Sequence, residues 1–128
     1  QQALEVAHVE ALKKLLETTA DEREKTRIEW TIEGLETVLN PVHLEVSELK
    51  EYEGTYGPRK IWLENGTLQY QRQGRPVYTL YPMGDHLFGV EGLDYFRLRF
   101  EVEMGGDVTR LIGLYDNGEQ DVTERSSS

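Results

Sequence analysis

The sequence predicts an α+β fold: a two-helix hairpin, then an antiparallel β-meander of about eight strands that curls into a closed or half-closed barrel. Three observations predict it. Apolar residues recur with a helical period up to Asn40 and alternate with a period of two from Tyr52 onward. Eleven of the twelve aromatic residues lie in the second half, which favours strands there. Gly-containing turn motifs separate the alternating segments.

An apolar stripe predicts the first helix, which begins at Gln2. The members of the stripe recur at spacings of three and four, so they share one helical face: Leu4, Ala7, Ala11, Leu12 and Leu15. His8 falls on this stripe, and we therefore expect its imidazole to be packed or half-buried. A polar stretch over residues 18–22 interrupts the pattern.

A second helix follows the interruption. Thr19 with Glu22 fits a capping box at its start, and Asp21 with Glu24 fits equally well. The apolar face of this helix is formed by Ile28, Ile32, Leu35 and Leu39. It ends before Pro41, because proline disfavours the α conformation in the preceding residue. We expect an antiparallel hairpin of two helices, with one long helix as the alternative.

Alternation and turn chemistry predict the strands. In residues 95–103, Phe96, Leu98 and Phe100 face one way while charged residues face the other, as in an antiparallel sheet with one buried face. Asn65-Gly66 predicts a type I′ hairpin turn, since both turn residues need positive φ. A meander of this length tends to close and so hide its edges. A curled open sheet is the alternative. The expected strands are 52–57, 59–64, 67–72, 76–82, 86–90, 95–103, 108–115 and 119–124.

Composition excludes several classes of function. The net charge of −10, without a cluster of Lys and Arg, argues against nucleic-acid binding. No apolar run approaches the roughly 20 residues that span a bilayer. The absence of cysteine excludes disulfides, thiolate catalysis and thiolate metal ligands. His8, His43 and His86 are scattered and lack the i, i+4 spacing of a helical zinc site. We therefore expect no metal and no cofactor.

One short motif could carry catalysis. Ser47 and Lys50 match the Ser-x-x-Lys nucleophile motif, but neither of its usual partner motifs follows. We expect instead that Ser47 caps a single helical turn before the first strand. The other serines are the last three residues, so no Ser-His-Asp triad is expected and no catalytic residue is assigned. A free-standing hydrolase that uses Ser47 is the least favoured alternative.

Tyrosines are the candidate ligand-binding residues. A tyrosine combines an apolar ring with a polar hydroxyl group, which suits a binding surface. The candidates are Tyr56, Tyr70, Tyr78 and Tyr81, which would line a cavity of the barrel. The competing interpretation is that tyrosines occupy strand borders and that a barrel of this size fills its own interior.

Several stretches together resemble a known family. They are residues 3–12 (ALEVAHVEAL), 52–59 (YEGTYGPR), 63–71 (LENGTLQYQ), 80–83 (LYPM) and 92–100 (GLDYFRLRF). In this order they are similar to the C-terminal tail domain of S41-family serine peptidases. That group comprises the tail-specific and C-terminal processing proteases, including relatives of interphotoreceptor retinoid-binding protein. Similar tails with a lipocalin-like fold follow some β-lactamase-like hydrolases.

The resemblance implies that the chain consists of three parts with different roles. Residues 1–48 would be a helical arm and linker that close a peptidase core missing from this chain. Residues 49–125 would be the β domain, and 126–128 a disordered tail. The chain begins without Met, so we expect a trimmed start. The implied function is a non-catalytic accessory domain that assists the core of the same polypeptide in proteolysis. The implied location is periplasmic, outer-membrane-associated or secreted. A homo-oligomer through the exposed arm and a lipocalin-like barrel for a small apolar ligand are the alternatives.

Overall fold

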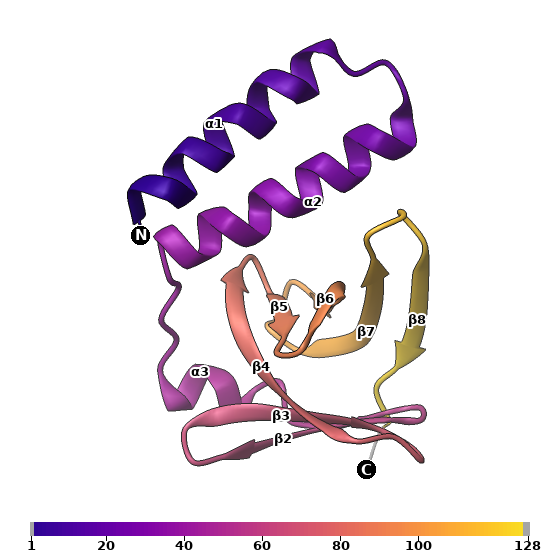
Figure 1. Ribbon diagram of the computed structural model, residues 1–128. Helices are drawn as coiled ribbons and strands as arrows, with labels where there is room; N and C mark the ends of the chain where they lie inside the picture. The colour runs from indigo at the N-terminus through magenta and orange to yellow at the C-terminus, as the bar shows by residue number, and fades with distance from the viewer. Residues whose placement is uncertain (1, 127–128) are drawn as a thin grey trace. The chain divides into compact units, whose positions relative to one another are not determined.

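A computed structural model describes the backbone of residues 2–126 and the side chains of residues 6–126 (Figure 1). Its helices are α1 (Gln2–Thr18), α2 (Glu22–Leu39) and α3 (Val46–Lys50). Its strands are β1 (Gly54–Tyr56), β2 (Arg59–Glu64), β3 (Thr67–Arg72), β4 (Val77–Gly84), β5 (Leu87–Val90), β6 (Leu93–Val102), β7 (Val108–Tyr115) and β8 (Gln120–Glu124). The predicted order of two helices and eight antiparallel strands is confirmed.

The helical hairpin packs through a face of α1 that shares Leu12 with the predicted stripe but is otherwise different. Val9 is buried and Leu12 and Leu16 pack beside it, against Ile28 and Ile32 of α2. The predicted stripe is therefore confirmed at Leu12 and wrong for three of its other members. Its members Ala7, Ala11 and Leu15 are exposed, and the Leu4 side chain lies outside the described residues. Valine and leucine bury more apolar area than alanine does, which favours the face that is used.

His8 is also exposed, contrary to the expectation of a half-buried ring. It precedes Val9 and so points about 100° away from the face that packs against α2.

The second helix follows the prediction closely. The carboxylate of its N-cap, Asp21, accepts a hydrogen bond of 2.8 Å from the backbone N–H of Arg23, which selects Asp21 over Thr19 as the cap. The helix ends at Leu39, two residues before Pro41. Its predicted apolar face is the one that meets α1.

The short helix α3 belongs with the β unit. Glu45 and Glu48 form a reciprocal capping box at its start, so Ser47 lies inside the helix and the prediction that Ser47 is the cap was wrong. Leu49 and Tyr52 are buried in the core of the barrel. The β unit accordingly comprises residues 43–115 and 120–126 of the described chain, with α3 inside it.

The eight strands form one meander in which every neighbour along the chain is also a neighbour in the sheet. Asn65 and Gly66 have φ of 53° and 82°, which confirms the predicted turn chemistry between β2 and β3. The first and last strands meet through a single bridge between Tyr56 and Arg125, and the backbone N–H of Ser126 donates to Thr55 O over 2.8 Å. The barrel is thus nearly closed. Of the predicted disordered tail, residues 127 and 128 lie outside the described residues.

Large apolar side chains fill the interior of the barrel. Leu98, Phe100 and Leu111 are at most 1% exposed, as the alternation of β6 predicts. The Tyr52 ring, which follows α3, lies 4.6 Å from the ring of Phe100, centroid to centroid. Arg97 departs from the predicted pattern, since it faces outward on β6 and is nevertheless only 5% exposed.

Candidate functional site

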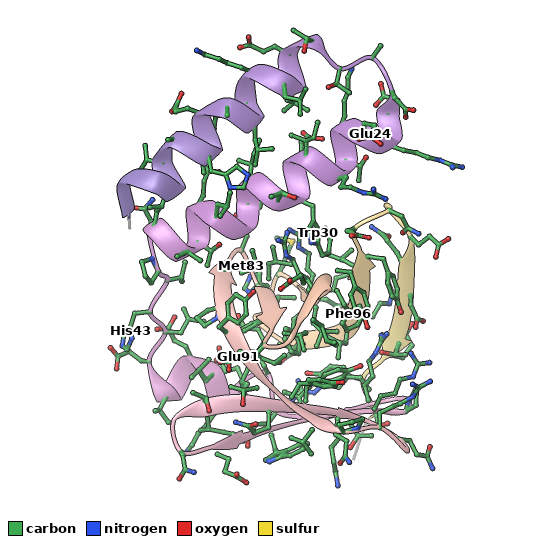
Figure 2. All side chains as sticks on the ribbon, in the orientation of Figure 1. Glu24, Trp30, His43, Met83, Glu91 and Phe96 are labelled. Atoms are coloured by element: carbon green, nitrogen blue, oxygen red, sulfur yellow. The ribbon has the colours of Figure 1, made fainter. Side chains whose placement is uncertain are left out.

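A pocket opens at one end of the barrel, where β3 and β7 end and β4 and β6 begin. Its volume is about 230 Å³. Aromatic and basic side chains line it, chiefly Tyr70, Tyr78, Phe96, Tyr115, Arg72 and Arg75. We call it the mouth pocket. Figure 2 shows Phe96 within the barrel, on the strand β6.

Strand register brings these side chains together. Tyr70 pairs directly with Tyr78 across β3 and β4, and Phe96 pairs with Tyr115 across β6 and β7. Residues opposite each other in neighbouring strands point to the same face of the sheet. Phe96 faces the interior, and its ring centroid lies 6.2 Å from that of Tyr70 and 5.0 Å from that of Tyr115. The pocket is therefore the open end of the barrel interior.

The structure places the four predicted tyrosines in three different environments. Tyr70 and Tyr78 line the mouth pocket together. Tyr56 lies in the core, fully buried, and its hydroxyl group donates a hydrogen bond of 2.7 Å to Tyr52 O. Burial raises the pKa of Tyr56 to about 12, although the nearby Arg125 guanidinium acts in the opposite direction. Tyr56 thus serves the packing of the core.

Tyr81 lies outside the barrel. Its strand partner is Gly89, and a β-carbon added to that glycine would come within 2.4 Å of three atoms of the Tyr81 ring. The ring therefore covers a glycine on the outer surface. Tyr78 and Tyr81 are three residues apart on one strand, which already places them on opposite faces.

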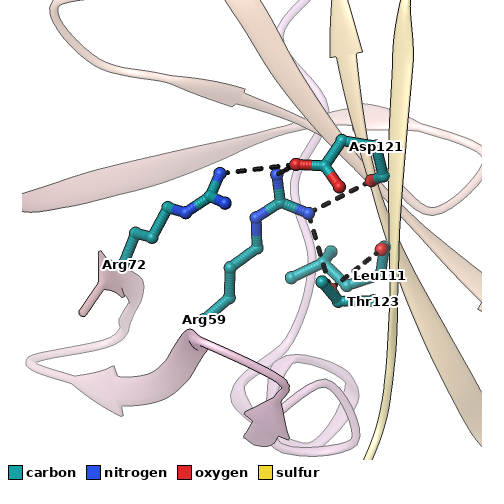
Figure 3. A network of polar contacts seen from close by, with 5 residues as sticks. All are labelled: Arg59, Arg72, Leu111, Asp121 and Thr123. Carbon is teal, nitrogen blue, oxygen red and sulfur yellow. Dashed lines mark hydrogen bonds and ion pairs between the residues drawn. The ribbon is translucent and has the colours of Figure 1, made fainter.

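A network of charged residues that the sequence patterns did not predict lies beside the mouth pocket (Figure 3). Arg59 is 0% exposed, and its guanidinium lies 2.9 Å from Asp121 Oδ2. It also donates to Asp121 O over 3.2 Å and to Thr123 Oγ1 over 3.4 Å. Arg72 reaches the same carboxylate oxygen over 3.3 Å. One carboxylate thus neutralises part of the charge of two arginines.

The position of the network follows from register. Arg59 and Arg72 are direct partners across β2 and β3, and like charges in that position repel each other. Asp121 on β8 offsets that repulsion. Arg59 Nε is buried and has no hydrogen-bond partner among the described residues, although its guanidinium carbon lies 5.7 Å from the Phe96 ring centroid.

A glycine makes room for the buried arginine. A β-carbon on Gly113 of β7 would lie 2.6 Å from an Arg59 guanidinium nitrogen and 2.9 Å from the Phe96 ring. Ordinary contacts between such atoms begin near 3.4 Å. The absence of a side chain at residue 113 therefore leaves room for both the Arg59 guanidinium and the Phe96 ring.

The remaining candidates of the sequence analysis are dispersed. Ser47 and Lys50 are both exposed on α3. His86 Nδ1 lies 2.8 Å from the Tyr52 hydroxyl oxygen, and His43 lies 3.5 Å from the carboxylate of Glu45. Within residues 6–126 no group of three or more His, Asp and Glu side chains is arranged to hold a metal ion. None of the described helices is long and apolar enough to cross a membrane.

Comparisons with protein-family models, with curated proteins and with solved structures found no match to this chain.

Proposed function

We propose that this chain is a non-catalytic accessory module of an S41-type serine peptidase, which packs on the catalytic core of the same polypeptide and assists it in proteolysis. Three observations support the proposal. The ordered stretches of sequence resemble the tail domain of that family. The fold that the resemblance implies is the fold observed. Helix α1 carries apolar residues that the helical hairpin leaves exposed.

That apolar surface is the single observation on which the proposal chiefly rests. Ala7, Ala11 and Leu15 lie on one face of α1, because they are separated by four residues, and all three are exposed. The Leu15 residue, the largest of the three, is 50% exposed. A partner that covered this stripe would remove apolar surface from water, which is favourable by about 25 cal/mol for each Å² buried. We propose that the partner is the peptidase core, and that the module is exported with it.

The test uses the full-length gene product. Leu15→Glu places a charge in the stripe, whereas Val38→Glu places one at a 57% exposed position of α2 and serves as the matched control. We expect Leu15→Glu to lower peptidase turnover several-fold and Val38→Glu to leave turnover within about twofold of the parent. A full-length product without a peptidase core would refute the proposal, and so would equal turnover of the two variants.

A second copy of the chain could occupy the same stripe. Sedimentation of the isolated chain separates the two cases. A dimer that Leu15→Glu dissociates would assign the stripe to self-association, and a monomer leaves it to the core.

The alternative function, a lipocalin-like barrel that holds a small apolar ligand, needs more space than the interior of this barrel offers. Leu98, Phe100 and Leu111 occupy the interior with almost no exposed surface. A ligand would have to enter at the mouth pocket, where the wall is basic as well as aromatic.

A further inference from the structure

We infer that the mouth pocket binds an aromatic group that carries one carboxylate, with the ring among the tyrosines and Phe96 and the carboxylate at Arg72 and Arg75. The inference does not rest on the proposed peptidase partnership, because every residue that it uses belongs to the β unit.

The charge of the pocket is opposite to that of the chain. The chain carries 24 acidic and 14 basic residues, yet no residue that lines the pocket is acidic and two are arginines. Asp121 is not one of the lining residues, and its Oδ2 atom already accepts from both Arg59 and Arg72. Arg72 is therefore paired with a carboxylate outside the lining, whereas Arg75 has no such partner among the described residues. An anion is the ligand that this lining favours.

Both arginines keep donors for a ligand. Arg72 has five N–H donors and spends one of them on Asp121, while its side chain stays 42% exposed. Arg75 lies in the turn after β3, and its guanidinium makes no ion pair with any residue in the described part of the chain. A guanidinium can hold a carboxylate through two parallel hydrogen bonds. Arg72 is also fixed in place by its bond to Asp121, so less side-chain freedom is lost on binding.

The rest of the wall is aromatic and bears hydroxyl groups. Tyr70 is only 4% exposed, and its hydroxyl oxygen makes no hydrogen bond with a described residue. Tyr70 lines the pocket, so its hydroxyl group is available to a ligand there. The rings of Tyr70, Phe96 and Tyr115 form a continuous surface on which a flat ring can pack.

The volume limits the ligand to one ring. Sites for drug-sized molecules usually measure about 300–1,000 Å³. At about 230 Å³ the mouth pocket falls below that range. A benzene ring with a short carboxylate arm fits this size. Such a group exists as a free aryl carboxylate and as the C-terminal residue of a peptide that ends in phenylalanine or tyrosine.

The test uses this chain with matched probes, measured by calorimetry and by shifts of backbone amide signals. The probes are phenylacetate, its uncharged analogue phenylacetamide, and a tetrapeptide ending in phenylalanine with a free or an amidated C-terminus. We expect a dissociation constant of about 1 mM for phenylacetate, as befits a ligand of this size. We expect phenylacetamide to bind at least about tenfold more weakly, since it loses the charge-assisted hydrogen bonds.

Two variants and one control locate the site. Arg75→Gln should weaken phenylacetate binding about fivefold or more and leave phenylacetamide binding unchanged. Arg99→Gln removes a charge from the exposed outer face of β6 and should change neither. Tyr78→Ala should weaken both ligands, because it removes part of the aromatic wall.

Each outcome decides the inference. Tighter binding of the free peptide than of phenylacetate assigns the site to a peptide C-terminus, and the reverse order assigns it to a free carboxylate. Equal binding of phenylacetate and phenylacetamide would overturn the inference. Failure of both to bind would overturn it too, and so would signal shifts that map away from Tyr70, Tyr78 and Tyr115. None of these results bears on Leu15 or on the peptidase partnership.

Discussion

Asp121→Asn removes the carboxylate that pairs with two arginines, one of which is 0% exposed, while it keeps the shape of the side chain. Loss of one partner from a fully buried ion pair costs about 3–5 kcal/mol. The Asp121 side chain is 37% exposed, so water offsets part of that loss. We therefore expect the free energy of unfolding to fall by about 2–3 kcal/mol, and the melting temperature to fall by about 8–12 °C.

The assay is urea denaturation followed by the fluorescence of Trp62, which lies on β2 of the barrel, in a Trp30→Phe background. Glu124→Gln is the matched control, because Glu124 lies on the same strand and pairs with Arg110 over 3.0 Å between side chains that are 70% and 45% exposed. An exposed pair of this kind contributes less than about 1 kcal/mol.

Adding Arg59→Met to Asp121→Asn isolates the cause of the instability. The second change removes the buried cation that the first one leaves unpaired, so the double variant should be more stable than Asp121→Asn alone. Equal urea midpoints for Asp121→Asn and Glu124→Gln would refute the reasoning. A double variant less stable than the single one would refute it as well.

Three further predictions concern packing and titration. The Tyr56 hydroxyl group has a pKa of about 12 in the folded state against 10 in the unfolded state. Its contribution to the free energy of unfolding is therefore complete below pH 10 and is lost as the pH rises to about 12. Urea denaturation between pH 8 and 12 should show that the free energy of unfolding falls by about 2 kcal/mol, and that it falls by less in Tyr56→Phe. An equal fall in the parent and in Tyr56→Phe would contradict this. Gly113→Ala should cost about 1–3 kcal/mol in the same assay through overpacking, whereas Gly105→Ala, with no atom near its added methyl group, should cost less than about 1 kcal/mol. Gly89→Ala should destabilise the parent strongly but not a Tyr81→Ala variant, whose ring no longer occupies that space, and thermal melts of the double-variant cycle check the coupling.

The strands were predictable because their signals are local. β2 and β3 begin and end at the predicted residues, since Asn65-Gly66 fixes the hairpin and alternation fixes the inward side chains. The face of α1 was not predictable in the same way. Two apolar stripes share that helix, and the choice between Leu15 and Leu16 depends on which stripe meets α2. Only the packed hairpin decides that choice, because both stripes have helical spacing.

The charged network could be predicted only in part. Arg59 and Arg72 occupy inward positions of alternating strands, and a charged residue at such a position signals a buried interaction. Their partner could not be identified, because Asp121 lies 62 residues after Arg59 and reaches it only when the meander closes. The mouth pocket depends on the same closure.

The two ends of the barrel differ in chemistry, and this difference explains how a filled interior can still present a site. At one end, Tyr52 packs on Phe88 and Phe100 with ring centroids 5.1 Å and 4.6 Å apart, so apolar rings close the barrel. Phe96 lies four residues from Phe100 on β6, about 13 Å away along the strand. At this second end, Arg59 is buried next to the Phe96 ring. The residues that line the mouth pocket leave it open. A buried arginine requires a fixed counter-charge, and Asp121 supplies it while holding Arg72 at the rim. The interaction that stabilises this end of the barrel therefore also orients a cation toward the pocket, so substitutions at Asp121 should change stability and anion binding together, whereas substitutions at Arg75 should change binding alone.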